Sequence, residues 1–128
     1  MAPQPPRRWS AEQDSAPEEP PRPFTVDATP WAGGTVLALR GELDLDSVAD
    51  LRAALDPALE TPGTVVVVDC AGLDFCDSTG LNALLRAQAR AVADGSRIDL
   101  ARPRPLVLRM LELTGATEAF RIRDAPPD

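Results

Sequence analysis

The most constraining feature of this chain is a run of β-branched residues at positions 64–69 (TVVVVD). β-Branched side chains favour strands, and a strand that is apolar at nearly every position is stable only when both of its faces are buried. The turn pair Pro62-Gly63 precedes the run and separates it from the segment before it. The run therefore predicts a short strand in the centre of a sheet, around which the other elements must be arranged.

Two strands and a helix are predicted before this central strand. Residues 24–28 and 35–40 alternate or run in β-branched and apolar residues, with turn residues between them, which is typical of an antiparallel hairpin. Ser47 is an N-cap candidate with Asp50 in a capping-box position, so a helix should follow the hairpin. Its apolar residues recur at helical spacing up to the turn before the central strand, and Pro57 should kink or interrupt it.

Helices and strands alternate after the central strand. The apolar pattern predicts a helix over residues 81–94, and then a strand over residues 97–101. Asp77, Ser78 and Thr79 lie just upstream of this helix as capping candidates. The helix N-terminus thus directly follows the loop that leaves the central strand.

The rest of the chain predicts a third helix between Pro105 and Gly115 and a last short strand over residues 120–123. The complete order, a hairpin followed by alternating helices and strands, is typical of a single α/β domain. We expect a mixed β-sheet of four to five strands with helices packed mainly on one side. The connections in its parallel part should be right-handed.

Residues 1–23 differ in composition from the rest of the chain. They hold half of the 14 prolines together with several acidic residues, and this composition buries too little apolar surface to offset the entropy lost on ordering. We therefore expect a disordered leader over residues 1–23 and one domain over residues 24–128. The leader has no apolar core typical of a signal peptide, and no later window is long enough to span a membrane, so the expected location is the cytoplasm.

The charge and the absence of histidine exclude several classes of protein. A formal net charge of -7 argues against nucleic-acid binding, since nucleic-acid modules present basic surfaces. Without histidine the chain lacks the usual general base and the commonest metal ligand. Its two cysteines, Cys70 and Cys76, are too few for a disulfide scaffold or a zinc site. We expect no enzymatic activity, no bound metal and no cofactor, with both cysteines as buried apolar fillers.

The segment at residues 74–81 (DFCDSTGL) places the hydroxyl group of Ser78 at the expected helix N-terminus. Two interpretations are open from the residues alone. In the first, Asp77, Ser78 and Thr79 only cap the helix. In the second, Ser78 is a phosphoacceptor, because free backbone N–H groups and the helix dipole stabilise a phosphate there, and Gly80 leaves room around it.

Three blocks of the sequence together resemble the STAS domain of the anti-sigma factor antagonists. The central block is residues 75–81 (FCDSTGL), preceded by residues 41–44 (GELD) and followed by residues 111–115 (LELTG), within a match over residues 24–124. This resemblance implies that the unphosphorylated protein binds an anti-sigma factor with serine kinase activity and thereby frees a sigma factor. Phosphorylation would end the binding, a serine phosphatase would reverse it, and ATP would belong to the kinase.

The resemblance also assigns roles to individual residues. Ser78 would accept the phosphate, with Thr79 as a minor alternative acceptor. Asp77 would orient the acceptor, and Gly80 would allow close approach. The expected partner-binding surface comprises Gly41, Glu42, Leu43, Asp44, Asp77, Ser78, Thr79 and Gly80.

Two alternatives remain at this point. One is a STAS module that is never phosphorylated and serves as a scaffold for a transporter ATPase or a sensory complex; phosphate on Ser78 distinguishes the two cases. The other is a phosphorelay receiver with Asp69 as acceptor, or an enzyme with Cys76 or Ser78 as nucleophile. A receiver needs a lysine and a nucleophile needs a base, and the chain has neither lysine nor histidine.

Overall fold

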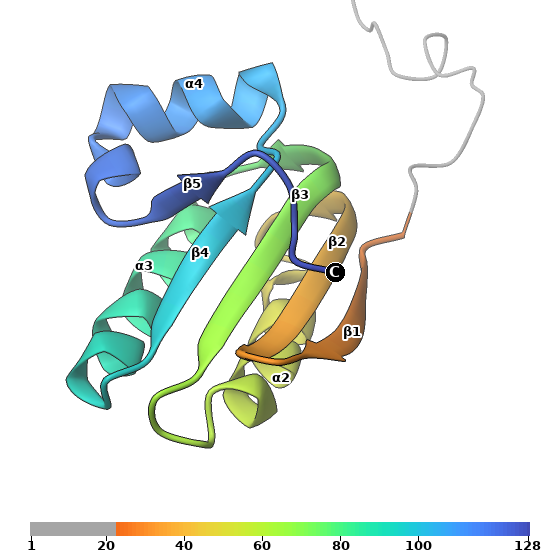
Figure 1. The fold of residues 1–128 in the computed structure, drawn as a ribbon. Coiled ribbons are helices and arrows are strands. Elements are labelled where there is room, and N and C mark those ends of the chain that lie inside the picture. Colours follow the sequence, from red (N-terminus) through yellow and green to blue (C-terminus); the bar gives the residue numbers. More distant parts are fainter. Residues whose placement is uncertain (1–22) are drawn as a thin grey trace, which may run out of the picture.

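Five strands form one mixed sheet in the computed structural model, which describes residues 23–128. The strands are β1 (Thr25–Trp31), β2 (Gly34–Leu43), β3 (Val65–Cys76), β4 (Arg97–Ala101) and β5 (Arg121–Arg123). β1 and β2 form the predicted antiparallel hairpin, and the other strands join it in parallel in the order β1-β2-β3-β4-β5 (Figure 1). The expected leader, residues 1–23, lies outside the described residues except for Pro23.

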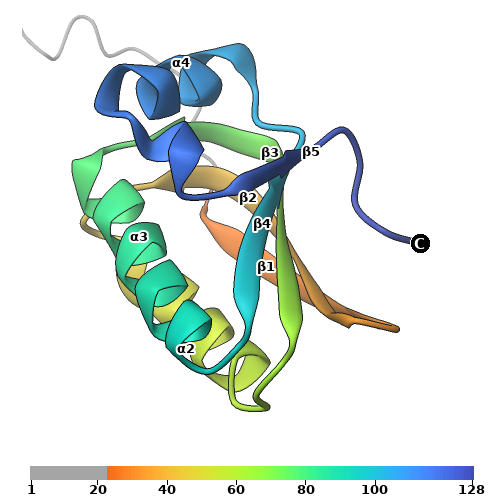
Figure 2. The ribbon, with the colours of Figure 1, turned by 60° about the vertical axis from the view of Figure 1, so that its left-hand side comes forward.

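Helices cover mainly one face of the sheet, as predicted. α2 (Val48–Ala58) and α3 (Ser78–Ala93) lie side by side on that face, and no helix of the described chain covers the other one (Figure 1, Figure 2). α4 (Pro105–Thr114) and the short 3-10 helix η1 (Ala116–Glu118) lie at the end of the sheet where β3 finishes. β3 is the middle strand of the sheet, which confirms that the valine run is central.

β3 continues to Cys76, well beyond the strand predicted at residues 64–69. β2 extends alongside it, and two register shifts in the pairing accommodate the extra length. At Gly72, within the extension, a Cβ atom would lie 2.8 Å from the Leu39 carbonyl oxygen, so a larger residue would push the two strands apart. Residues in the extension do not alternate between apolar and polar, and periodicity alone therefore does not predict it.

α2 begins after Ser47, as predicted, but its capping and its end differ from the prediction. Ser47 occupies the N-cap position, but its side chain makes no capping hydrogen bond, so the expected capping box with Asp50 is wrong. The Ser47 hydroxyl instead donates to the Glu42 carbonyl oxygen at 2.8 Å and stabilises the preceding turn. The helix ends at Ala58, before the turn at Pro62-Gly63 and close to the interruption expected at Pro57.

Most of the apolar core lies between the sheet and the two helices, and one buried amide is embedded in it. The Gln88 side chain donates to the carbonyl oxygens of Ile98 and Ala119 at 3.0 and 2.7 Å and accepts from the Ile98 N–H at 2.7 Å. Because its nitrogen and its oxygen are both bonded, its burial carries little penalty. The largest fully buried apolar side chains of this core are those of Leu37, Leu39, Leu43, Leu51, Leu55, Leu73, Ile98, Leu100, Leu111, Val66 and Val68.

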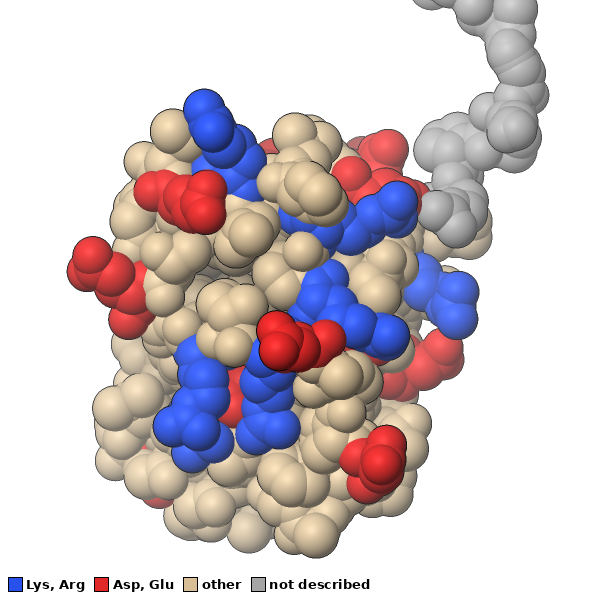
Figure 3. All heavy atoms as spheres, turned by 45° about the horizontal axis from the view of Figure 1, so that its top comes forward, with Lys and Arg blue, Asp and Glu red and all other residues tan. Residues whose placement is uncertain are grey.

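Ion pairs between arginines and buried aspartates hold the helix-free face. Asp99 is fully buried and accepts hydrogen bonds from Arg97 at 2.9 Å and from Arg123 at 2.8 Å. Asp69 accepts two hydrogen bonds from Arg102, at 2.7 and 3.1 Å. Arginine side chains accordingly gather on this face (Figure 3). Each buried carboxylate is thus compensated, and the short β5 is tied to β4.

Both cysteines are buried under the helices. Burial, together with the charges of Asp69 and Cys76, raises the pKa of the Cys70 thiol to about 12. Burial and the charge of Asp77 raise the pKa of the Cys76 thiol to about 12. The thiolate is the reactive form of cysteine, and it is therefore scarce at neutral pH in both residues.

Both cysteines are expected to resist alkylation while the protein is folded. Iodoacetamide at neutral pH should modify neither thiol in buffer and both thiols in guanidinium chloride, because unfolding exposes them and returns their pKa to the ordinary range. Mass spectrometry of the intact protein counts the adducts. Rapid modification of one thiol in the folded protein would contradict the burial of that cysteine.

Candidate functional site

The N-terminus of α3 is the centre of the candidate site. Asp77 is its N-cap: the backbone there is extended, and Asp77 Oδ1 accepts a hydrogen bond from the Gly80 N–H at 3.1 Å. One residue thus does the capping for which three were candidates. Ser78 is the first helical residue, and its hydroxyl is not used to cap the helix.

Ser78 is exposed at this helix end. Within residues 23–128, no acceptor bonds to the backbone N–H of Ser78 or of Thr79. α3 is 16 residues long, so its dipole adds partial positive charge at the same place. A phosphate attached to the Ser78 Oγ would therefore find hydrogen-bond donors next to it.

Packing requires a glycine at position 80. Gly80 is buried, and a Cβ atom there would lie 2.6 Å from Leu43 Cγ and 3.1 Å from Cys76 Sγ. This is a reason for glycine that the sequence did not indicate, and the expected room around Ser78 stays a prediction. Gly80 lets the first turn of α3 sit directly against the end of β2.

The pairing of β2 with β3 brings the GELD block next to the helix N-terminus. Glu42 is in register with Phe75, and Leu43 is in register with Cys76. The Asp77 N–H then donates to the Leu43 carbonyl oxygen at 3.1 Å. Two blocks that are far apart in the sequence thus form one continuous surface.

Side-chain hydrogen bonds hold the turn that follows β2. Asp44 Oδ1 accepts from the Asp46 N–H at 3.0 Å and from the Ser47 N–H at 3.2 Å. The Ser47 hydroxyl accepts from the Asp44 N–H at 3.0 Å and donates to the Glu42 carbonyl oxygen. This network holds the Asp44 carboxylate and the backbone of Glu42 in the turn that leads into α2.

The predicted partner-binding residues divide into accessible and buried ones. Accessible side chains can contact a partner, whereas the buried residues only shape the surface from beneath. The third block, residues 111–115, is not part of this division. It forms the end of α4, where Gly115 adopts a φ of 76°. The accessible residues are Glu42, Asp44, Asp77, Ser78 and Thr79, and the buried ones are Gly41, Leu43 and Gly80.

No motif in the sequence predicts the apolar groove that lies beside this helix end. The groove has a volume of about 220 Å³, lies between the end of β3 and α4, and is lined by Phe75, Cys76, Leu106, Val107 and Met110. Phe75 and Leu106 are 41% and 65% exposed, and exposed apolar patches mark protein contacts. The one trace of the groove in the sequence is that α4 carries apolar residues on its outer as well as its inner side.

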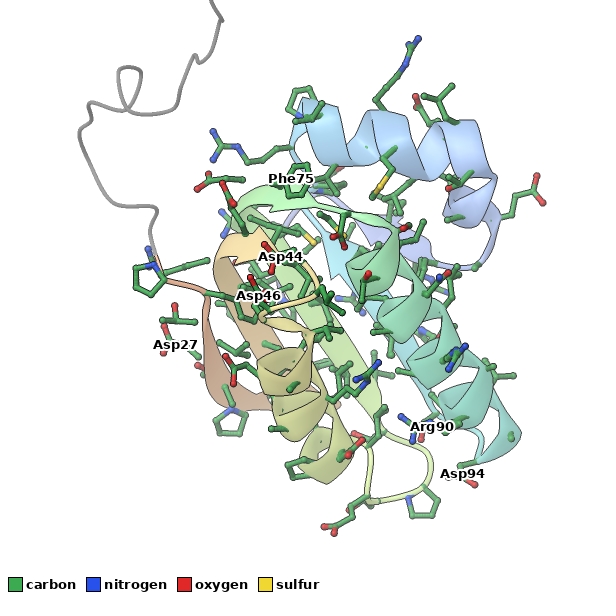
Figure 4. The ribbon with its side chains drawn as sticks, turned by 180° about the vertical axis from the view of Figure 1, so that it is seen from behind. Asp27, Asp44, Asp46, Phe75, Arg90 and Asp94 are labelled. Carbon is green, nitrogen blue, oxygen red and sulfur yellow. The ribbon has the colours of Figure 1, made fainter. Side chains whose placement is uncertain are left out.

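Carboxylates occur in both segments that meet at this helix end. The turn after β2 carries Asp44 and Asp46, which Figure 4 shows at the same end of the sheet as Phe75. Asp77 directly precedes the hydroxyl in the chain. A partner that binds here meets a negative surface, to which a phosphate would add further charge.

The described residues offer neither a metal site nor a membrane-spanning helix. Residues 23–128 hold no group of three or more side chains that could bind a metal ion. None of the helices in the same part of the chain is both long and apolar enough to cross a membrane.

Known proteins match this chain over most of its length. A family model described as "Mlab, STAS domain" matches residues 15–123. The anti-sigma-F factor antagonist RsfB of Mycobacterium tuberculosis is 26% identical over 102 residues, which cover 80% of this chain and 83% of RsfB. An anti-sigma F factor antagonist of Lysinibacillus sphaericus is 30% identical over 81 residues, which cover 62% of this chain and 69% of that protein.

The fold matches as well. The unphosphorylated form of the anti-sigma factor antagonist SpoIIAA has a TM-score of 0.64 at 24% identity, over 78% of this chain and 87% of that chain. The phosphorylated form of SpoIIAA from Bacillus has a TM-score of 0.60 at 23% identity, over 78% of this chain and 90% of that chain. With its sequence and fold taken together, this chain belongs to the STAS-domain family of anti-sigma factor antagonists.

Proposed function

We propose that this protein is an anti-sigma factor antagonist that is switched by phosphorylation of Ser78. In the unphosphorylated state it binds an anti-sigma factor that is also a serine kinase, and a sigma factor is thereby released. The kinase transfers the γ-phosphoryl group of ATP to the Ser78 hydroxyl and the complex dissociates. A serine phosphatase restores the binding state. The protein acts in the cytoplasm and catalyses no reaction itself.

The exposed Ser78 hydroxyl at the open N-terminus of α3 carries this proposal. A kinase needs an accessible acceptor, and capping does not occupy this one because Asp77 makes the capping bond. The two unbonded N–H groups of the first turn and the helix dipole stabilise the phosphorylated product. Phosphorylation at this position is therefore compatible with an intact fold.

The carboxylates around Ser78 give a reason why phosphate would end binding. A phosphoserine brings about 1.5 to 2 negative charges beside Asp77 and the turn after β2. At about 6 Å and an effective dielectric near 20, each pair of unit charges repels by roughly 3 kcal/mol before screening by salt. If the partner interface covers the phosphate and the neighbouring carboxylates, their repulsion weakens the complex. A cost of about 2.7 kcal/mol is enough to weaken binding a hundredfold.

The apolar groove between β3 and α4 supplies an attraction that does not depend on charge. Binding energy in interfaces is concentrated in a few buried apolar or aromatic contacts, with polar residues at the rim. Phe75 and Leu106 offer such contacts beside the acidic rim of the site. We therefore assign the groove to the anti-sigma factor interface, with Ser78 at its edge as the switch.

Substitutions at Ser78 test the switch. Ser78→Ala should fold normally, take no phosphate from the partner kinase and ATP, and stay bound to the anti-sigma factor. Ser78→Asp should bind more weakly than the native protein, but less weakly than the phosphorylated form, because it adds only about one of the roughly two charges of a phosphate. Isothermal titration calorimetry of the native, phosphorylated and variant proteins compares their affinities.

Thr79→Ala is the matched control for the acceptor, since it removes the neighbouring hydroxyl and should leave phosphorylation of the chain unchanged. Phosphate that maps by mass spectrometry to Thr79 alone would contradict the assignment. Equal affinity of the native and phosphorylated forms would also contradict it. A chain that binds its partner and never takes phosphate would be the scaffold module considered as the alternative.

A substitution in the apolar groove tests the proposed interface independently of phosphorylation. Leu106→Ser should reduce affinity for the anti-sigma factor about tenfold, because loss of a buried apolar contact at an interface costs more than about 1 kcal/mol. Leu113→Ser is the control: Leu113 is 74% exposed on the same helix and does not line the groove. Equal effects of the two substitutions in the same calorimetric titration would argue against the groove as a contact.

A further inference from the structure

A second groove runs between α2 and α3, on the face of the molecule seen in Figure 4. We call it the arginine groove. It has a volume of about 510 Å³ and an apolar floor formed by Leu55, Ala83 and Ala87. It lies apart from the groove beside Ser78, which is formed by β3 and α4.

The rim of the arginine groove is cationic although the protein is acidic. Arg52 from α2 and Arg86 and Arg90 from α3 line it, with Asp56 as the carboxylate among its lining residues. Arg90 pairs with Asp56 at 3.5 Å. No carboxylate within residues 23–128 lies at ion-pair distance from Arg52 or Arg86. Two guanidinium groups are thus available for an anionic ligand.

The positive charge is confined to the arginine groove itself. An adjoining hollow of about 410 Å³ toward the C-terminal ends of the two helices carries Glu60 and Asp94. Figure 4 shows Asp94 at that end of α3 and Arg90 between the helices. A negatively charged segment is therefore favoured beside Arg52 and Arg86 and disfavoured further along.

The chain contains a segment of matching charge. Residues 11–19 (AEQDSAPEE) carry four carboxylates and no cationic side chain. They lie in the sequence shortly before Pro23, the first residue that the structure describes. We infer that this acidic segment of the chain binds in the arginine groove.

The tether between the acidic segment and the domain is long enough. Pro23 lies against Gly41, just before the turn that leads into α2: a Cβ atom on Gly41 would be 2.8 Å from the Pro23 carbonyl oxygen. An extended chain spans at most about 3.6 Å per residue, so Glu19 can reach about 14 Å from Pro23 and Glu12 about 40 Å. These distances exceed the helix diameter of about 10 to 12 Å that the segment must cross to reach the groove.

The tether also favours the chain's own segment over that of another copy. A short flexible linker holds its end at an effective concentration in the millimolar range. Exposed ion pairs are individually weak and are screened by salt. Binding should therefore be intramolecular, reversible and sensitive to ionic strength.

Paramagnetic relaxation measurements on the full chain test this inference. Ser15→Cys places a single reactive thiol in the acidic segment for a nitroxide label, because burial raises the pKa of Cys70 and Cys76 to about 12 and protects them. Amide signals of α2 and α3 around the groove should lose the most intensity, and those of β5, at the edge of the sheet, should lose the least. Raising the ionic strength to about 1 M, where the Debye length is about 3 Å, should restore the lost intensity.

Charge variants of the labelled chain separate the arginine groove from a general attraction. Arg52→Glu combined with Arg86→Glu should restore the signals, whereas Arg40→Glu combined with Arg121→Glu makes the same charge change elsewhere and should not. Replacing Glu12, Asp14, Glu18 and Glu19 by their amides should also restore the signals. This last variant leaves the folded domain untouched, so it gives a result even if the groove variants are unstable.

Three results would overturn the inference. The first is signal loss spread evenly over all faces of the domain. The second is signal loss that survives the reversal of Arg52 and Arg86. The third is equal signal loss when labelled, isotope-free protein is mixed with unlabelled, isotope-enriched protein, because the segment of a second copy would then occupy the groove.

Discussion

The parallel pairing of β2 with the second half of β3 is the contact on which the site depends. Leu43 links three of its parts: its carbonyl oxygen binds the Asp77 N–H, its side chain lies under Gly80, and its backbone leads into the acidic turn. Leu43 is fully buried, so its position is set by the core rather than by the surface. The surface residues of the two blocks, residues 41–44 and 75–81, are held in place by the same contacts. The site is therefore as rigid as the sheet.

At the start of α3, one residue caps the helix and the next one is left exposed. A helix N-terminus leaves several N–H groups without intrahelical partners, and side chains normally satisfy them. Here Asp77 satisfies the Gly80 N–H, while those of Ser78 and Thr79 have no acceptor among the described residues. Because Asp77 makes the capping bond, the exposed Ser78 hydroxyl is not needed to cap the helix.

Much of the fold could be predicted because short-range patterns and packing agree. The valine run, the hairpin and the apolar face of α3 each follow from residues close in sequence. The extension of β3 and the hydrogen bonds that Ser47 makes instead of capping α2 could not be predicted in this way. The extension depends on the pairing of β2 with β3 beyond residue 69, which is a long-range contact without a periodic pattern, and the Ser47 hydroxyl bonds to the Glu42 carbonyl oxygen of the preceding turn rather than to the helix.

The candidate site, too, could be predicted only where it depends on residues close together in the sequence. The block around Ser78 was predictable from residue types, because a hydroxyl between a capping residue and a glycine has few structural uses. The reason for Gly80 was not predictable, since the side chain that would collide with a Cβ atom belongs to β2. The apolar groove was missed for a similar reason. Its two sides, Phe75 and Leu106, come from separate elements. In the sequence, neither residue differs from an ordinary apolar residue.

The distribution of charge, rather than the net charge of -7, decides what a phosphate on Ser78 would do. Arginines on the helix-free face are bound to Asp69 and Asp99, and Arg104 at the start of α4 is bound to Asp74 at 2.9 Å. These cations are engaged and are poorly placed to neutralise a phosphate within the domain. A phosphate that met a free arginine would form an internal ion pair and reorganise the domain itself. At an acidic helix end its charge stays on the surface, where a bound partner must meet it. Under the proposed switch the domain would keep one conformation with and without phosphate, and the affinity of the partner would change.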